Sequence, residues 1–316
     1  MANEFSVVGG AGFIGSHIVQ SLVESNKTVN VIDNFCSGSP TQLGKFLKHS
    51  SVVVNELDVE NTSDLIKAIS GSRVVIHLAS NPDIARASID PRIDFTQGTL
   101  LTESVVEASR VSGVEKILYA SGSGVYGDAG DNTLTEDSKL NPISTYGASK
   151  LAGESLLSSY AYMFGIKAIA FRFANVVGPR QTHGVGYDFI RRLTADPTSL
   201  RILGNGRQTK SYVHVNDVIN AVLSFVDHQG PNFDVYNIST RDSLSVNDIG
   251  DLTFKVLGLN KSDINITFTG GERGWKADVP IVKLDPSKIE STGWRPKFTS
   301  QEAMQDALVA MRQEIL

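Results

Sequence analysis

Short apolar runs alternate with longer segments of helical periodicity along most of the chain. The first run, Phe5–Val8, is followed by a glycine turn and then by apolar residues at helical spacing from Ile14 to Val23. Other runs of strand length lie at 29–32, 52–54, 74–78, 117–120, 168–171, 212–215 and 235–238, and further helices are predicted near 62–70, 92–112 and 146–164. This alternation predicts an α/β fold built on a doubly wound, parallel Rossmann sheet.

The alternation loosens after Asn175, where segments 178–210 and 260–300 contain more Gly, Pro and charge. We therefore expect a smaller, interleaved C-terminal substrate lobe. The predicted Rossmann domain covers 1–175 and about 211–250, and the predicted lobe covers about 176–210 and 251–316.

A glycine motif, Gly9xxGly12xxGly15, joins the first strand to the first helix. Such glycines allow a tight turn, bring backbone N–H groups to a pyrophosphate and let the helix approach the sheet. The second strand ends in Asp33, whose carboxylate can accept hydrogen bonds from both hydroxyls of an adenosine ribose. No lysine or arginine follows until Lys45, so we predict NAD rather than NADP as the cofactor.

Other cofactor candidates follow the predicted strands, because ligands of doubly wound sheets bind at the carboxyl ends of the strands. The predicted cofactor-binding residues are Gly9, Gly12, Phe13, Ile14, Gly15, Asp33, Asn34, Phe35, Ser37, Gly38, Asp58, Val59, Leu78, Ala79, Ser80, Tyr146, Lys150 and Phe173.

Tyr146 and Lys150 lie one helical turn apart in Tyr146xxxLys150. A neighbouring cation favours a phenolate, so we expect the pKa of Tyr146 to lie well below its usual value of about 10. The pair is therefore a candidate catalytic base at neutral pH.

Composition excludes several functions. The chain has 316 residues, 41% of them hydrophobic, and a formal charge of −5 without a basic face, which argues against nucleic acid as a partner. No apolar run approaches a membrane span, and the N-terminus lacks a signal-peptide pattern, so we expect a cytoplasmic protein without a membrane partner. One cysteine and six histidines show no metal-ligand spacing, and no metal is expected.

Several motifs in fixed order resemble the extended short-chain dehydrogenase/reductases, and most of all the UDP-glucose 4-epimerases. The resemblance runs to Gly293-Trp-Arg-Pro296 near the end of the chain. Its motifs are the glycine turn, Asp33-Asn34, Leu57-Asp58-Val59, His77-Leu-Ala79, Tyr119-Ala-Ser-Gly-Ser-Gly-Val-Tyr-Gly127, Tyr146xxxLys150 and Asn175-Val-Val-Gly-Pro179.

The resemblance implies NAD-dependent C4 epimerisation of a UDP-hexose, UDP-glucose or UDP-galactose, through a transient 4-keto sugar. Tyr146 would take the proton of the sugar 4-hydroxyl while the C4 hydride passes to NAD. Lys150 would hold the tyrosine ionised and bond the nicotinamide ribose. The resemblance also implies a homodimer that pairs through the helices near 92–112 and 146–164.

Five substrate-binding candidates are carried over from the resemblance in the same way. Asn175 and Arg273 would contact the diphosphate, and Arg201 and Leu203 would lie beside the uracil. Lys210 stands where relatives usually have an arginine, which keeps the charge but not the fork geometry. Separately, Val282 aligns with a position where a bulky residue excludes an acetamido group, so we expect UDP-GlcNAc to react also.

The serine loop departs from the family pattern. The expected hydroxyl residue is Gly122, which is flanked by Ser121 and Ser123. We hypothesise that Ser123 substitutes catalytically and that Ser121 supports the cofactor side. Ser123 and Gly124 also occupy positions where 4,6-dehydratases and UDP-glucuronate decarboxylases carry acids, so net dehydration is poorly supported.

Two alternatives stay open at this point. One is a UDP-glucuronate 4-epimerase or another sugar-nucleotide-modifying relative, with Arg86 as the candidate cation for the C6 carboxylate. The other is a non-catalytic NAD-sensing module. Retention of Tyr146 and Lys150 weighs against the sensor, whereas Gly122 weighs for it.

Overall fold

The chain divides into two compact units, each built from several segments of the sequence. The structure, a computed structural model, describes residues 4–58, 61–81 and 86–315. Unit 1 comprises Met1–Val125, Pro142–Arg172 and Ile219–Tyr236, and unit 2 comprises Tyr126–Asn141, Phe173–Val218 and Asn237–Leu316. The chain therefore passes between the units several times.

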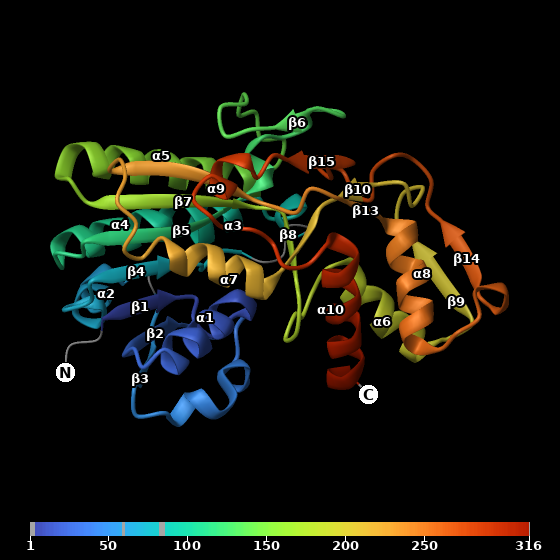
Figure 1. The fold of residues 1–316 in the computed structure, drawn as a ribbon, viewed down its shortest axis with the longest axis horizontal. Coiled ribbons are helices and arrows are strands. Elements are labelled where there is room, and N and C mark those ends of the chain that lie inside the picture. The colour runs from blue at the N-terminus through green and yellow to red at the C-terminus, as the bar shows by residue number, and fades with distance from the viewer. Residues whose placement is uncertain (1–3, 59–60, 82–85, 316) are drawn as a thin grey trace. The chain divides into compact units, whose positions relative to one another are not determined.

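A seven-stranded sheet forms the centre of unit 1, in the order β12-β7-β5-β4-β1-β2-β3 (Figure 1). Pairs on both sides of β1 are parallel, and Val8 lies opposite both Ile32 and His77. The order reverses between β1 and β4, which confirms the predicted doubly wound sheet. The strands are β1 (Phe5–Val8), β2 (Val29–Asp33), β3 (Val52–Glu56), β4 (Val74–His77), β5 (Lys116–Gly122), β7 (Lys167–Phe173) and β12 (Phe233–Ile238).

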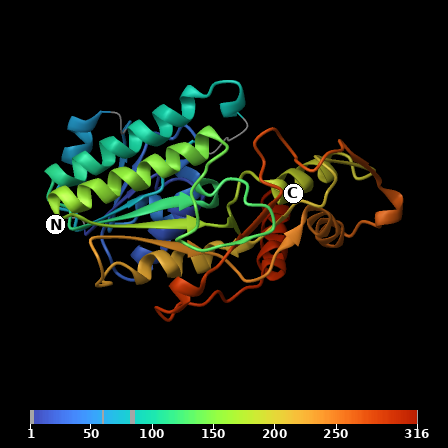
Figure 2. The same ribbon diagram turned by 90° about the horizontal axis from the view of Figure 1, so that it is seen from above.

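Helices cover this sheet. Figure 2 shows α4 (Leu101–Val111) and α5 (Thr145–Phe164) side by side on one face, and α2 (Thr62–Ile69) packs against α4. Leu65, Val105 and Leu157 from these three helices are buried in one core cluster with the strands. The residues of α1 (Phe13–Glu24) lie outside that cluster and pack against β1 and β2.

The helix predicted near 92–112 is interrupted. It consists of a short α3 (Arg92–Asp94), a π-helical segment η3 (Phe95–Leu100) and then α4. A side chain at Gly98 would lie 2.6 Å from Ser149 Oγ, so the wider π turn brings backbone into direct contact with α5. Such π turns inside helices often occur at functional sites.

Unit 2 contains a helical layer and several small sheets. Phe189 of α6, Phe254 of α8 and Leu308 of α10 belong to its core cluster. The sheets are ordered β13-β10-β15-β6, β11-β8 and β14-β9. The elements are β6 (Thr133–Leu134), β8 (Asn175–Val177), α6 (Val185–Ala195), β9 (Ser199–Ile202), β10 (Thr209–Lys210), β11 (Tyr212–His214), α7 (Val215–Ser224, which continues into unit 1), β13 (Leu244–Ser245), α8 (Val246–Leu257), β14 (Asn265–Phe268), β15 (Ile281–Leu284), α9 (Ser287–Glu290) and α10 (Ser300–Ile315).

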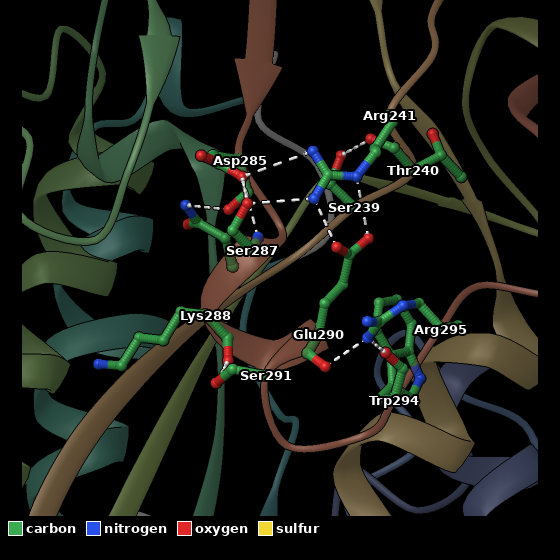
Figure 3. A network of polar contacts seen from close by, with 11 residues as sticks. Ser239, Thr240, Arg241, Asp285, Ser287, Lys288, Glu290, Ser291, Trp294 and Arg295 are labelled. Carbon is green, nitrogen blue, oxygen red and sulfur yellow. Dashed lines mark hydrogen bonds and ion pairs between the residues drawn. The ribbon is translucent and has the colours of Figure 1, made fainter.

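An arginine anchors the segment that follows β15. Figure 3 shows the Arg241 guanidinium with Asp285 and Ser287 on one side and the Glu290 carboxylate on another. Arg241 Nε donates to Glu290 Oε1 at 3.1 Å, and Nη2 donates to Ser287 Oγ at 3.1 Å. These bonds tie α9 to the loop after β12 and so hold the end of the strand that carries Val282.

None of the helices in the described ranges has the length and apolar composition needed to cross a bilayer.

Candidate functional site

Two glycines of the turn in unit 1, Gly9 and Gly15, stand where the packing leaves no room for a side chain. Gly9 has φ 81°, and a Cβ there would lie 2.7 Å from the nitrogen of Ala79. A Cβ on Gly15 would lie 2.1 Å from the carbonyl oxygen of Gly9. The N–H groups of Leu78 and Ala79 both donate to the Val8 carbonyl, at 2.9 and 3.1 Å. The turn after β1 and the segment after β4 thus meet at the reversal of strand order.

The N-terminus of α1 has the properties of an anion site. Helix α1 starts after Gly12, with no acidic residue in its first turn and no side-chain cap. The first-turn N–H groups, including those of Phe13 and Ile14, have no acceptor within the helix. A Cβ on Gly12 would meet only the Gly9 carbonyl oxygen, at 3.4 Å, so there is space beside this helix end. The residues present fit a pyrophosphate.

Asp33 lies beside this turn and is held by backbone N–H groups. Its Oδ2 accepts from Ala11 N and its Oδ1 from Phe35 N, both at 2.9 Å. Each carboxylate oxygen can accept a second hydrogen bond, which suits the two hydroxyls of a ribose. Gly38 closes the loop, because a Cβ there would lie 2.8 Å from the Ala11 carbonyl oxygen. The loop fits the adenosine half of NAD.

Most of the predicted cofactor residues of unit 1 lie in the turns that follow β1, β2 and β4. Asn34 and Ser37 are exposed on the Asp33 loop, and Asp58 is exposed after β3. Phe173 belongs to unit 2, and Val59 lies outside the described residues.

Tyr146 and Lys150 both lie in the first turns of α5. Ser144 caps the helix, with its Oγ accepting from Gly147 N at 3.0 Å. Lys150 is 3% exposed, and its Nζ donates to the Ala120 carbonyl at 2.8 Å. The same Nζ lies 5.6 Å from the centroid of the Tyr146 ring. The fold therefore brings the predicted pair together over the end of β5.

The protonation of the pair differs from the sequence-based expectation. Burial raises the pKa of Tyr146 to about 12, although a hydrogen bond with Ser80 acts to lower it. Burial also lowers the pKa of Lys150 to about 7. The expected pKa of Tyr146 well below 10 is therefore corrected: the loss of water around the phenolate outweighs the hydrogen bond with Ser80, and the Lys150 ammonium bonds a backbone carbonyl.

A buried ion pair lies behind the serine loop. Ser121 Oγ donates to Glu154 Oε1 at 2.5 Å, and Arg172 bonds the same carboxylate through Nε at 3.0 Å and Nη2 at 2.7 Å. All three residues are at most 4% exposed. Sequence reasoning missed Glu154 and Arg172. The signal that could have found Glu154 was its position one turn after Lys150.

The rest of the serine loop lies directly against the first turn of α5. A Cβ on Gly147 would lie 2.4 Å from the Gly124 carbonyl oxygen, and one on Gly124 would lie 4.0 Å from Tyr146 Cδ1. Ser123 begins the 3₁₀ turn η4 (Ser123–Val125) and is partly exposed. Because Gly122 and Gly124 flank Ser123, the backbone around its hydroxyl can adjust more freely than usual.

In unit 2, Asp278 connects two of the predicted substrate cations. Its Oδ1 accepts from Lys210 Nζ at 2.6 Å, its Oδ2 accepts from Gly274 N at 3.0 Å, and its carbonyl accepts from Arg273. Arg273 also forms an ion pair with Asp128. Asp278 is 5% exposed and was missed from the sequence, where a single aspartate gives no signal.

The other predicted substrate residues surround this cluster to different degrees. Leu203 is 45% exposed, and a Cβ on Gly274 would lie 3.6 Å from Leu203 Cβ. Arg201 is exposed on β9. Asn175 begins β8, and its side chain bonds the hydroxyl of Tyr212. The structure thus places Leu203 with Lys210 and Arg273 in one cluster.

Two residues tied to the alternative substrates are also placed. Val282 is buried on β15, where it pairs with Lys210 of β10. Arg86 is exposed in the 3₁₀ turn η2 (Arg86–Ser88), and residues 82–85 before it lie outside the described residues.

Comparisons with known proteins find relatives along nearly the whole chain. The model of the NAD dependent epimerase/dehydratase family matches residues 5–239. A UDP-glucose 4-epimerase of Mycolicibacterium smegmatis is 34% identical over 94% of this chain and 95% of the relative. A solved UDP-galactose 4-epimerase is 36% identical with a TM-score of 0.87 over 99% of both chains. The UDP-glucuronic acid 4-epimerase of Bacillus cereus, solved with UDP-glucuronic acid and NAD, is 26% identical with a TM-score of 0.89, and covers 98% of this chain and 99% of its own.

Proposed function

Because the chain belongs to the NAD-dependent epimerase/dehydratase family and uses NAD, we propose that it interconverts UDP-glucose and UDP-galactose through a transient 4-keto sugar. The observation that supports this most is the position of Tyr146 and Lys150 on α5, with the serine loop packed against the same turn. The mycobacterial relative and the solved UDP-galactose 4-epimerase support the choice of sugar.

The residues of unit 1 divide the chemistry between them. NAD bound at the glycine turn and Asp33 would supply the hydride acceptor and donor for C4 of the sugar. Tyr146 removes the proton from the 4-hydroxyl and gives it back. Lys150 supplies the positive charge that stabilises the phenolate, and this charge matters because burial raises the Tyr146 pKa to about 12. Gly12 and the first turn of α1 bind the pyrophosphate, and Asp33 binds the ribose.

In unit 2, the cluster of Lys210, Arg273 and Asp278 is suited to a nucleoside diphosphate. Lys210 and Arg273 are both ion-paired already, so a diphosphate would compete with Asp278 and Asp128 for them. The exposed side chain of Leu203 offers an apolar surface for a base. Val282 is smaller than an aromatic residue, so the N-acetylated sugar UDP-GlcNAc would also be accepted.

A UDP-glucuronate 4-epimerase is the second candidate. The likeness to the Bacillus cereus enzyme and the exposed cation Arg86 favour it. Arg86 would then bind the C6 carboxylate.

The test incubates the purified protein with NAD and each of UDP-galactose, UDP-GlcNAc and UDP-glucuronate, and follows the C4 epimers by proton NMR. We expect conversion of UDP-galactose to UDP-glucose, and a loss of at least about 100-fold in Tyr146→Phe. Product from UDP-glucuronate alone would favour the second candidate. Binding of NAD without any product would identify a sensor module and reject the proposal.

We also propose a homodimer formed through α4 and α5. Apolar side chains are exposed on these helices and on the π segment before α4, including Leu100 at 37%, Val111 at 50% and Tyr162 at 92%. Apolar side chains exposed along one pair of packed helices are typical of a surface that a second copy covers.

A further inference from the structure

Asp94 is a buried carboxylate close to the Tyr146–Lys150 pair that sequence reasoning did not identify. It ends α3 and is 1% exposed. Its Oδ1 accepts from the Asn81 side-chain amide at 2.9 Å, and its Oδ2 accepts from the Thr145 hydroxyl at 2.7 Å. Both donors are neutral, so hydrogen bonds hold the carboxylate in place without cancelling its charge.

Asp94 differs in this respect from the other buried carboxylate of the site. Glu154 is paired with Arg172 through two hydrogen bonds. Within the part of the chain that the structure describes, no lysine, arginine or histidine lies within ion-pair distance of Asp94. A buried, unpaired carboxylate is costly unless a cation elsewhere in the site balances it. The negative charge of Asp94 therefore affects the pKa values of the titratable groups around it.

Asp94 lies beside the start of α5, so its negative charge acts mainly on the groups at that end of the helix. Thr145, which bonds Asp94, is the first residue of α5 and precedes Tyr146. The π segment that follows Asp94 packs one turn further along α5, where Gly98 meets Ser149. The carboxylate is thus fixed relative to the helix that carries the pair, at the helix end where negative charge is favoured.

Lys150 is the cation whose pKa the charge of Asp94 raises. Besides Asp94 and Glu154, the titratable groups that face Lys150 are His77, Tyr119 and Tyr146. Burial keeps the His77 pKa at about 3 and raises the pKa of Tyr119 far above neutrality, so both stay neutral. Among the residues that the structure describes, two carboxylates raise the pKa of Lys150, Asp94 more than Glu154, against the burial that lowers it to about 7.

We propose that Asp94 is a positioning residue that acts through Lys150: its unpaired carboxylate holds the buried lysine as the ammonium that the reaction needs. This inference rests on the proposed role of Lys150. Asp94 also disfavours the phenolate of Tyr146, so the ammonium of Lys150 has to offset this effect when Tyr146 ionises to act as the base. Without Asp94, the buried amine would lose its proton at a lower pH.

The test titrates Lys150 directly in the full-length protein. Lysine labelled with carbon-13 at Cε is followed by NMR from about pH 6 to about pH 10, and Lys150→Met assigns the resonance. We expect Asp94→Asn to lower the pKa of Lys150 by about one pH unit. Asp90→Asn is the matched control, because it removes an exposed carboxylate four residues earlier and is expected to change nothing. Thr145→Val keeps the charge but removes one hydrogen bond, so its Lys150 should titrate as in the unsubstituted protein.

The pH dependence of kcat provides a second, independent test. Because the cation is lost as the pH rises through its pKa, the alkaline limb of kcat against pH should move to lower pH in Asp94→Asn by the same amount as the NMR titration. Asp94→Ser removes the charge in the same way and replaces Asp94→Asn if that variant does not fold.

An unchanged Lys150 titration in the charge-removing variant would overturn the inference, and so would an equal shift in Thr145→Val. The titration needs no turnover, so a protein that epimerises nothing would reject the proposed function while the role of Asp94 is still decided by NMR.

Discussion

Ser121 and Ser123 flank the glycine that replaces the expected hydroxyl residue, and the structure separates their surroundings. Ser121 is buried and donates to Glu154, which also binds Arg172. Ser123 is partly exposed at the start of a 3₁₀ turn, and within the described residues its hydroxyl has no hydrogen bond. Ser123 is therefore the hydroxyl that can turn toward a substrate without breaking an existing bond.

This difference predicts opposite effects of two alanine substitutions. Ser123→Ala should lower kcat by about 100-fold with little change in melting temperature, because it would remove the proposed hydrogen bond to the reacting oxygen. Ser121→Ala should mainly lower the melting temperature, because it leaves a buried carboxylate oxygen with one donor fewer. Steady-state kinetics and thermal unfolding of both variants check this. If Ser123→Ala keeps near-normal turnover and Ser121→Ala loses it, the assignment is wrong.

At the scale of elements, two structures build the site: the turn between β1 and α1, and the first three turns of α5. In the turn, a Cβ on Gly15 would clash with backbone atoms, whereas a Cβ on Gly12 would make one ordinary contact. Helix α5 carries Tyr146, Lys150 and Glu154 at successive turns, so one rigid element fixes the phenol, the ammonium and the ion pair behind them.

The two glycines of the turn should respond differently to alanine. Gly15→Ala forces a Cβ to 2.1 Å from a carbonyl oxygen and should destabilise the fold by about 3 kcal/mol or more. Gly12→Ala has an ordinary backbone φ of −81° and an open Cβ position. It should keep the melting temperature but weaken NAD binding at least about tenfold, because the methyl group would occupy the proposed pyrophosphate position. Calorimetry with NAD and thermal unfolding measure the two effects. NAD binding of normal strength in Gly12→Ala would contradict the assignment of this turn.

The ion pair on α5 predicts a large effect on stability. Glu154→Gln leaves the buried Arg172 guanidinium without its counter-charge, and should lower the free energy of unfolding by about 3–5 kcal/mol. Urea denaturation measures the change. Glu107→Gln is the matched control, since its partner Arg110 lies on the surface of α4 and the midpoint should barely move. Equal midpoints for the two variants would show that the buried pair adds no stability.

At the scale of the whole molecule, the chain is expected to work as a pair of copies. We predict that light scattering gives twice the chain mass of 34.1 kDa for the purified protein. Leu100→Asp combined with Val111→Asp should give the single-chain mass, because two charges would be buried in the proposed contact. The exposed substitution Val53→Asp on β3 is the control and should stay paired. A single-chain mass for the unsubstituted protein would rule the homodimer out.

The sequence by itself determined the fold class and the main motifs. Local apolar periodicity predicted the strands of the Rossmann sheet, and the spacing of Gly9, Gly12 and Gly15 predicted the turn between β1 and α1. These features depend on residues that are close together in the sequence, so short sequence patterns are enough to predict them. The same locality predicted that Tyr146 and Lys150 share one helix face.

Only the tertiary structure decided the electrostatics of the site. The Tyr146 pKa of about 12 reflects how many atoms surround the phenol, and the partners of Ser121, Lys210 and Asp94 come from 33, 68 and 51 residues away. Burial and charge at such separations depend on how the segments pack, which local sequence patterns do not specify. The sequence therefore predicted which residues carry the chemistry, whereas the tertiary structure set the pKa of the Tyr146 phenol and of the Lys150 amine.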